Sequence, residues 1–190
     1  MFATEIRDII DRCPYQFTDD EVPDPIIGLF YDYTNLYSFF TRITPAMYWI
    51  VKWKTEPPKS LIHDPQIQTY DFERNTCAML WIKFCNGDVP LYLRHDPAIT
   101  DEVGTTCAME CIIGHRCDVP TYLRHDPTIQ TNQGHTCAML WIEFCKGDVP
   151  EWMRHDPAIK TYLGETCIRY WRTYRNSDIT TYLRISQTHR

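Results

Sequence analysis

Thr76-Cys77-Ala78-Met79 recurs as Thr106-Cys107-Ala108-Met109 and again as Thr136-Cys137-Ala138-Met139, so the chain repeats itself every thirty residues. Related stretches begin at Thr44 and Thr166. A unit of this length cannot enclose a hydrophobic core alone and must bury its apolar face against its neighbours. The sequence therefore predicts an all-α fold, an α-solenoid of stacked helix-turn-helix units joined by short hairpin-type turns.

Each unit is predicted to open with a helix. Thr stands at the N-cap, where its hydroxyl accepts a hydrogen bond from a backbone N–H group that the helix leaves without a partner. Apolar residues then recur with the spacing of one helical face, at Ala78, Trp81, Ile82 and Cys85. We expect this to be the inner helix of the stack.

A second, shorter helix is predicted in each unit. Gly87-Asp88-Val89-Pro90 ends the first helix and places Asp88 as the N-cap of the second. The second helix stops at a His-Asp-Pro triplet, because the residue before a proline is pushed out of helical geometry. An extended segment follows, and a turn containing Gly104, Gly134 or Gly164 leads to the next Thr.

At this point the units resemble the ankyrin repeat family. Gly134-His135-Thr136-Cys137-Ala138-Met139 is similar to the Gly-x-Thr-Pro-Leu-His opening of that family, and Thr44-Pro45-Ala46-Met47 is closer still. Asp126 precedes Gly134 with the spacing of the family's hairpin. The resemblance covers roughly residues 44 to 185. It implies a protein-binding scaffold whose turn tips and adjacent inner-helix surface contact partners.

Three regions are expected along the chain. Residues 1–43, rich in aromatic side chains, are predicted to form a helical N-terminal cap. Residues 44–165 hold four ankyrin-like repeats. Residues 166–190 are predicted to be a C-terminal capping repeat, because Arg169 and Arg172 replace apolar or neutral residues of the inner helix.

Composition narrows the function classes. The formal net charge is -6 and there is no Lys/Arg run, so nucleic acid is not an expected partner. The charged N-terminus does not fit a secretory signal, and the most apolar segment is interrupted by Asp32 and Asn35, so no membrane association is expected. We expect a cytoplasmic, intracellular monomer, located in the host cytosol if the chain comes from a virus or another pathogen.

Catalysis is not expected either. The repeats leave no room for a separate catalytic domain, and the chain has no phosphate-binding loop, nucleophile elbow or metalloprotease motif. The sequence therefore predicts a protein that is not an enzyme and needs no cofactor.

Nine cysteines give an odd count, and four share one register position: Cys77, Cys107, Cys137 and Cys167. Stacked helices lie about 10 Å apart, whereas a disulfide needs Cα atoms within about 7 Å. This ladder cannot cross-link. We expect the cysteines to be reduced, small core residues in a cytosol-like compartment.

The periodic Arg94-His95-Asp96, Arg124-His125-Asp126 and Arg154-His155-Asp156 triplets suggest acid/base chemistry or a metal. The structural alternative is that His caps the last carbonyls of the short helix while Asp accepts hydrogen bonds from turn N–H groups. Recurrence at the same joint of each unit favours the structural role.

Repeat three departs from the others. Cys111 stands where its neighbours have Trp, His115 where they have Cys, and Cys117 where they have Gly. One hypothesis is a zinc site formed by Cys111, His115 and Cys117, which lacks a fourth ligand or a CxxC pair; the favoured alternative is buried thiols and no metal site.

The same substitutions suggest a central groove. Losing a Trp and a Phe between two units that keep theirs leaves a depression unless repacking closes it. The residues assigned to this groove are Trp81, Phe84, Ile113, Trp141 and Phe144.

The turn tips vary in sequence while the frame around them stays constant. Apolar residues at exposed turns are costly unless they bind something, although they could instead pack on the neighbouring turn. The candidate partner-binding residues are Tyr70, Phe72, Glu102, Val103, Asn132, Gln133, Tyr162 and Leu163. We expect a scaffold that masks or bridges a partner protein, as an adaptor or an inhibitor. The alternatives are a zinc- or small-ligand-binding protein centred on repeat three, and an oligomerising solenoid.

Overall fold

The structure is a computed structural model that describes residues 44–69 and 73–175. The predicted N-terminal cap, the tip residues Tyr70 and Phe72, and residues 176–190 of the predicted capping repeat lie outside the described residues. Within the described ranges the protein is helical and contains no strand. Its α-helices are α3 (Pro45–Trp53), α4 (Cys77–Phe84), α5 (Cys107–Ile113), α6 (Cys137–Phe144) and α7 (Cys167–Tyr174).

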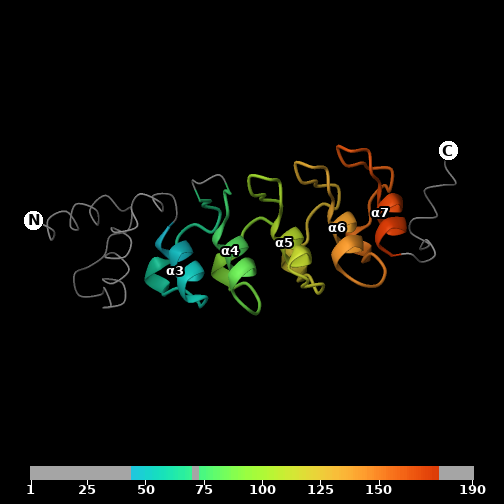
Figure 1. The fold of residues 1–190 in the computed structure, drawn as a ribbon. Helices are drawn as coiled ribbons and strands as arrows, with labels where there is room; N and C mark the ends of the chain where they lie inside the picture. Colours follow the sequence, from blue (N-terminus) through green and yellow to red (C-terminus); the bar gives the residue numbers. More distant parts are fainter. Residues whose placement is uncertain (1–43, 70–72, 176–190) are drawn as a thin grey trace, which may run out of the picture.

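These helices lie side by side in chain order (Figure 1). Each one packs against the next, from α3 on α4 to α6 on α7. The turns that precede the helices lie along one edge of this row, and the loops that leave the helices lie along the other (Figure 1). The coarse prediction of an all-α protein built from repeating units is confirmed.

Threonine is the N-cap of every described α-helix, as predicted. The hydroxyl of each Thr accepts a hydrogen bond from the backbone N–H three residues on, at 3.2 Å for Thr76 and Met79. In the first two units the Met thioether also accepts from the N–H of the capping Thr, at 3.5 Å in each case. The Met thioether thus takes the place that a Glu or Gln side chain has in a capping box. This explains the Thr-x-x-Met spacing.

In the four units where the structure describes it, the second helix is a single 3-10 turn. The four turns are η1 (Lys59–Leu61), η2 (Leu91–Leu93), η3 (Thr121–Leu123) and η4 (Glu151–Met153). The predicted cap by Asp88 is wrong: η2 starts after Pro90 and has no side-chain cap. An N-cap at Asp88 would have to bond the N–H of Pro90 or Leu91, and proline has none.

The core runs continuously through the row. Its members at each joint are small or flexible: the Ala, Cys and Met of the Thr-Cys-Ala-Met motif have at most 1 % exposure in α4, α5 and α6. The last residue of each 3-10 turn, such as Leu93 or Met153, is also buried. Side chains of this size let neighbouring helices approach closely. Nowhere in residues 44–69 and 73–175 does a helix reach the length and apolarity that crossing a membrane requires.

Helix α7 differs from the inner helices on its far side. Tyr170 and Trp171 are buried, whereas Arg169 and Arg172 are exposed. This solvent-exposed face fits the expected capping role. The boundaries of the three predicted regions stay predictions.

Candidate functional site

A histidine, a threonine and a cysteine meet at each joint between units. His95 Nε2 lies 2.8 Å from Thr76 Oγ1, the cap of its own unit, and 3.6 Å from the Sγ atom of Cys107 in the next unit. Its Nδ1 lies 2.7 Å from the carbonyl oxygen of Asp96. His63, His125 and His155 repeat this arrangement.

These contacts fix the form of the imidazole. A carbonyl oxygen only accepts, so Nδ1 must donate, and Nε2 of the neutral ring then accepts from the Thr hydroxyl. The Thr oxygen stays free to accept from the helix N–H. Burial lowers the pKa of His95 and of His155, which favours the same neutral form.

The structural role predicted for the His-Asp-Pro triplet is therefore correct, but the predicted partner of the histidine is wrong. The ring bonds the helix cap rather than the last carbonyls of the short turn. The aspartate behaves as expected, because Asp96 Oδ1 accepts from the Ala98 N–H at 2.9 Å.

The four Cys–His pairs resemble the nucleophile and base of a cysteine hydrolase only in composition. Cys77, Cys107, Cys137 and Cys167 are fully buried. Burial raises the pKa of Cys77, Cys137 and Cys167 to about 12 and that of Cys107 further. A thiol that stays protonated and has no access to solvent is not an activated nucleophile.

A disulfide joins repeats three and four. Cys117 and Cys145 are bonded, with their Cα atoms 5.7 Å apart, so the expectation that all cysteines are reduced is wrong for this pair. The ladder argument holds for residues at one register position, and those four cysteines are free. Cys117 and Cys145 differ in register by two residues, which brings the loop of one unit against the helix end of the next.

The disulfide also removes the zinc hypothesis. Cys117 has no thiolate to offer a metal, and Cys111, His115 and Cys117 do not form a cluster. Across residues 44–69 and 73–175 no group of three or more His, Cys, Asp or Glu side chains is arranged to hold a metal ion. We therefore do not retain this alternative.

Helix α5 ends differently from α4 and α6. His115 adopts the left-handed conformation, with φ of 59°, and its N–H bonds the carbonyl of Ile112 while the N–H of Arg116 bonds that of Cys111. This is a Schellman ending. It releases the Arg116 side chain to donate to the carbonyl oxygen of Cys85 in the preceding unit.

A hollow of about 420 Å³ lies where repeats two and three meet. We call it the central hollow, and it is lined by Ile82, Asn86, Gly87, Asp88, Val89, Cys111, Arg116, Asp118, Pro120, Tyr122 and Leu123. The hollow borders Cys111, where repeat three has lost its Trp, but none of the five residues assigned to the predicted groove lines it. Trp81 and Trp141 are packed inside, with 7 % and 8 % exposure, whereas Phe84 and Ile113 are exposed and Phe144 is half-buried.

Neighbouring turns are joined through their backbones. The N–H of Glu102 donates to the Glu73 carbonyl at 3.0 Å, that of Asn132 to Val103 at 2.8 Å, and that of Tyr162 to Gln133 at 3.1 Å. A Cβ atom on Gly104 would lie 2.7 Å from Asn132 N, so glycine is needed for this approach as well as for its φ of 81°. The turns lie along one edge of the row (Figure 1), and these hydrogen bonds connect them.

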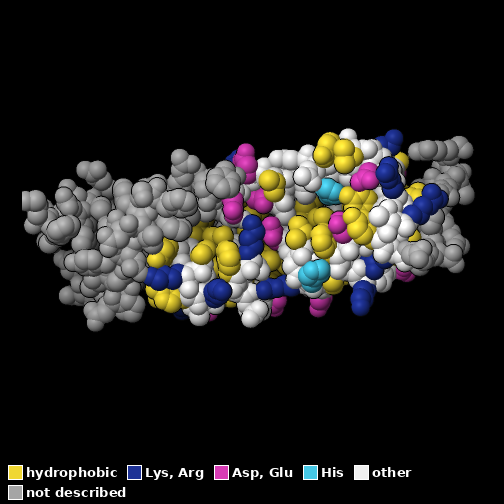
Figure 2. Space-filling view, viewed as in Figure 1, with side chains coloured by type: hydrophobic (Ala, Val, Ile, Leu, Met, Phe, Trp, Pro, Cys, Tyr) yellow, Lys and Arg dark blue, Asp and Glu magenta, His cyan; other side chains and the backbone are white. Residues whose placement is uncertain are grey.

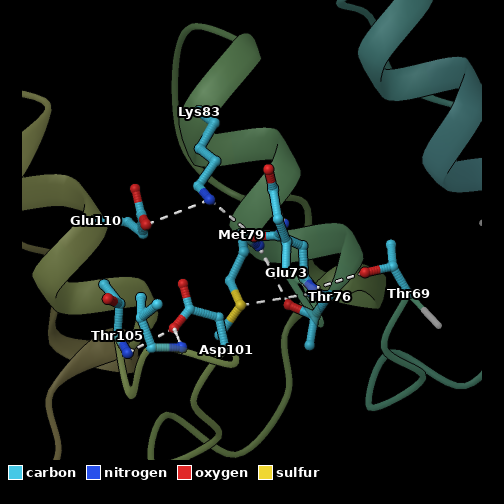
Figure 3. A network of polar contacts seen from close by, with 10 residues as sticks. Thr69, Glu73, Thr76, Met79, Lys83, Asp101, Thr105 and Glu110 are labelled. Carbon is cyan, nitrogen blue, oxygen red and sulfur yellow. Dashed lines mark hydrogen bonds and ion pairs between the residues drawn. The ribbon is translucent and has the colours of Figure 1, made fainter. Parts of the chain in front are cut away.

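Each turn is also fixed from within. Asp101 Oδ1 accepts from the N–H groups of Val103 and Thr105, at 3.0 and 2.7 Å, and Thr69 accepts from Asn75 at 2.9 Å (Figure 3). Thr131 and Thr161 do the same for the next two turns. Sequence reasoning missed these residues, although Thr131 and Thr161 recur at the thirty-residue spacing.

The described tip residues all face solvent. Val103, Tyr162 and Leu163 are 59 %, 71 % and 66 % exposed, and Glu102, Asn132 and Gln133 are exposed too. A hydrophobic patch lies at the edge of the row over the turn that precedes α7 (Figure 2). Most of the surface of these apolar side chains is therefore open to solvent.

Comparison with known proteins adds no second line of evidence. The sequence matches no family model, no curated protein and no solved structure.

Proposed function

We propose that the protein is a binding scaffold, a divergent ankyrin-like solenoid whose turn edge holds another protein. The observation that carries this proposal is the exposure of Val103, Tyr162 and Leu163 on tips that are locked together by backbone hydrogen bonds. Large apolar side chains held rigidly in water cost free energy unless a partner covers them.

The separation between recurring residues and variable residues along the chain supports a scaffold. The residues that recur every thirty positions build the joints, and the residues that vary stand on the tips. A fixed frame with changeable tips lets a partner be selected without disturbing the fold. The proposed mechanism is occupancy: the bound edge masks or bridges the partner, as an inhibitor or an adaptor.

A comparison of two surface variants with wild type tests the proposal. Tyr162→Ser combined with Leu163→Ser removes the largest apolar tip. Leu91→Ser is the matched control, because Leu91 is an equally apolar residue with 77 % exposure that lies on a 3-10 turn away from the tips. All three proteins are immobilised, incubated with native lysate and analysed by quantitative mass spectrometry.

We expect one set of proteins to bind wild type and Leu91→Ser alike and to bind the tip variant at least tenfold less. Those proteins are then purified and titrated against the three baits. Equal capture by all three baits would show that the tips are not the site.

A further inference from the structure

The central hollow lies at the one described joint where the chain's own tryptophan is missing. The same register position holds Trp81, Trp141 and Trp171 in repeats two, four and five, and each is at most 8 % exposed. Repeat three has Cys111 there. A thiol fills far less space than an indole ring, and the surrounding structure has only partly collapsed around it.

The hollow has the make-up of a binding pocket. Its floor is apolar and buried, formed by Ile82, Val89, Cys111 and Leu123. Its rim is polar and exposed, formed by Asn86, Asp88 and Asp118. The volume of about 420 Å³ falls within the range of small-molecule sites, about 300 to 1,000 Å³.

The walls of the hollow are held in place by contacts of their own. The hydroxyl of Tyr122 accepts from the N–H of Val89 at 3.0 Å, and the Arg94 guanidinium carbon lies 3.5 Å from the centre of the Tyr122 ring. Arg94 Nε also donates to the Val89 carbonyl, at 3.0 Å. On the opposite side Arg116 is tied to the carbonyl of Cys85. A site organised in this way does not have to be ordered when a ligand enters.

We propose that the central hollow receives the indole side chain of a tryptophan presented by a partner protein. The ring restores the packing that the chain supplies itself in repeats two, four and five. The Arg116 guanidinium and the Tyr122 ring are suitable neighbours for an aromatic face. Asp88 and Asp118 offer carboxylate oxygens at the rim to an indole N–H.

This inference rests on the proposed scaffold function, since it gives the partner one anchor in addition to the tips. The two contact regions use different residues. The turn edge presents Val103, Tyr162 and Leu163, and none of them lines the hollow.

The test uses N-acetyl-tryptophanamide as a probe of the side chain, with N-acetyl-leucinamide as the aliphatic control. Each is titrated into the full-length protein while amide signals are followed by NMR. We expect saturable shifts of the Val89, Leu123 and Gly87 signals with the tryptophan probe, in the millimolar range, and at least tenfold weaker binding of the leucine probe. No shift up to the solubility limit would overturn the proposal.

Two substitutions locate the binding. Cys111→Trp fills the hollow and should abolish the shifts, whereas Cys111→Ser keeps it open and should leave them intact. Unchanged binding to a folded Cys111→Trp protein would contradict the proposal. If that variant does not fold, contacts between the indole protons of the probe and the methyl groups of Ile82, Val89 and Leu123, measured by nuclear Overhauser effects in wild type, decide the matter: their absence overturns it.

The same variants separate this proposal from the scaffold function. The Tyr162→Ser, Leu163→Ser protein should bind the tryptophan probe as wild type does. Probe binding without any captured protein would leave the hollow established as an indole site and refute the partner. Capture that depends on the tips but is unaffected by Cys111→Trp would refute the hollow as an anchor and leave the scaffold standing.

Discussion

At the scale of single residues, the threonine that caps each helix has two functions. Thr76 accepts from the Met79 N–H with its oxygen and donates its hydroxyl proton to His95. Its side chain is completely buried, so no water replaces a lost partner. One residue therefore couples the start of the helix to the joint that carries the next unit.

Replacing Thr76 by Val keeps the shape and removes both bonds. We expect the free energy of unfolding to fall by about 2 to 4 kcal/mol, because a lost cap costs about 1 kcal/mol and a buried unsatisfied group about 1 to 3 kcal/mol. Thr121→Val, at an exposed position of η3, is the matched control and should change it by less than about 0.5 kcal/mol. Urea unfolding measures both, and equal effects would contradict the assigned role.

Acid should weaken the fold through the buried histidines. Their pKa values are lowered in the folded state, so unfolding takes up protons once the pH falls below the ordinary value of 6.5. The contribution of these histidines to the free energy of unfolding is complete above pH 6.5 and is lost progressively as the pH falls below it. Thermal unfolding from pH 7.5 to 5.5 should show a falling midpoint, and His95→Ala should start lower and fall less. Parallel curves for the two proteins would show that His95 does not contribute.

Whether a contact could be predicted from the sequence depends on how far apart its two residues lie in the chain. The Thr cap was predictable because donor and acceptor lie three residues apart in a pattern that recurs. The histidine contacts were not, because Thr76 lies 19 residues before His95 and Cys107 lies in the next unit. Local propensity carries no information about either contact, whereas the thirty-residue period correctly indicated that the triplet is structural.

At the scale of elements, repeat three combines three departures in one place. Its helix α5 is followed by His115 in the left-handed conformation. Its loop is bonded through Cys117 to Cys145 of the next unit. The small side chain of Cys111 leaves space for the central hollow. The disulfide was not predictable from the cysteine ladder, because Cys117 and Cys145 occupy different register positions. The lost Trp at position 111 pointed to repeat three, but the lining of the central hollow was not predictable, because it depends on which way the neighbouring side chains point.

The disulfide should contribute measurably to stability. Closing a loop of 28 residues is worth about 3 to 4 kcal/mol by the chain-entropy estimate. We expect Cys117→Ser, or reduction of wild type, to lower the urea midpoint accordingly, with little further effect of reductant on the variant. A peptide map without reductant should contain the linked Cys117 and Cys145 peptides. Alkylation of both thiols in the native protein would contradict this prediction.

At the scale of the whole molecule, the repeats separate frame from contact surface. The all-α repeat architecture was predictable because a thirty-residue period leaves a unit no other way to bury its apolar face. The tips were predictable as exposed, variable turns. What sequence could not supply is the backbone bonding from Glu73 to Tyr162 that joins them into one edge, since each bond pairs residues about thirty positions apart.

Hydrogen exchange of the protein alone and bound to its purified partner tests the central claim most directly. We predict new protection of amides at the three described tips, residues 101–104, 131–134 and 161–164, and at residues 86–89 beside the central hollow, with little change elsewhere along the opposite edge, at η4 (Glu151–Met153). Partner-induced protection confined to that opposite edge, with the tips exchanging as in the free protein, would contradict the account.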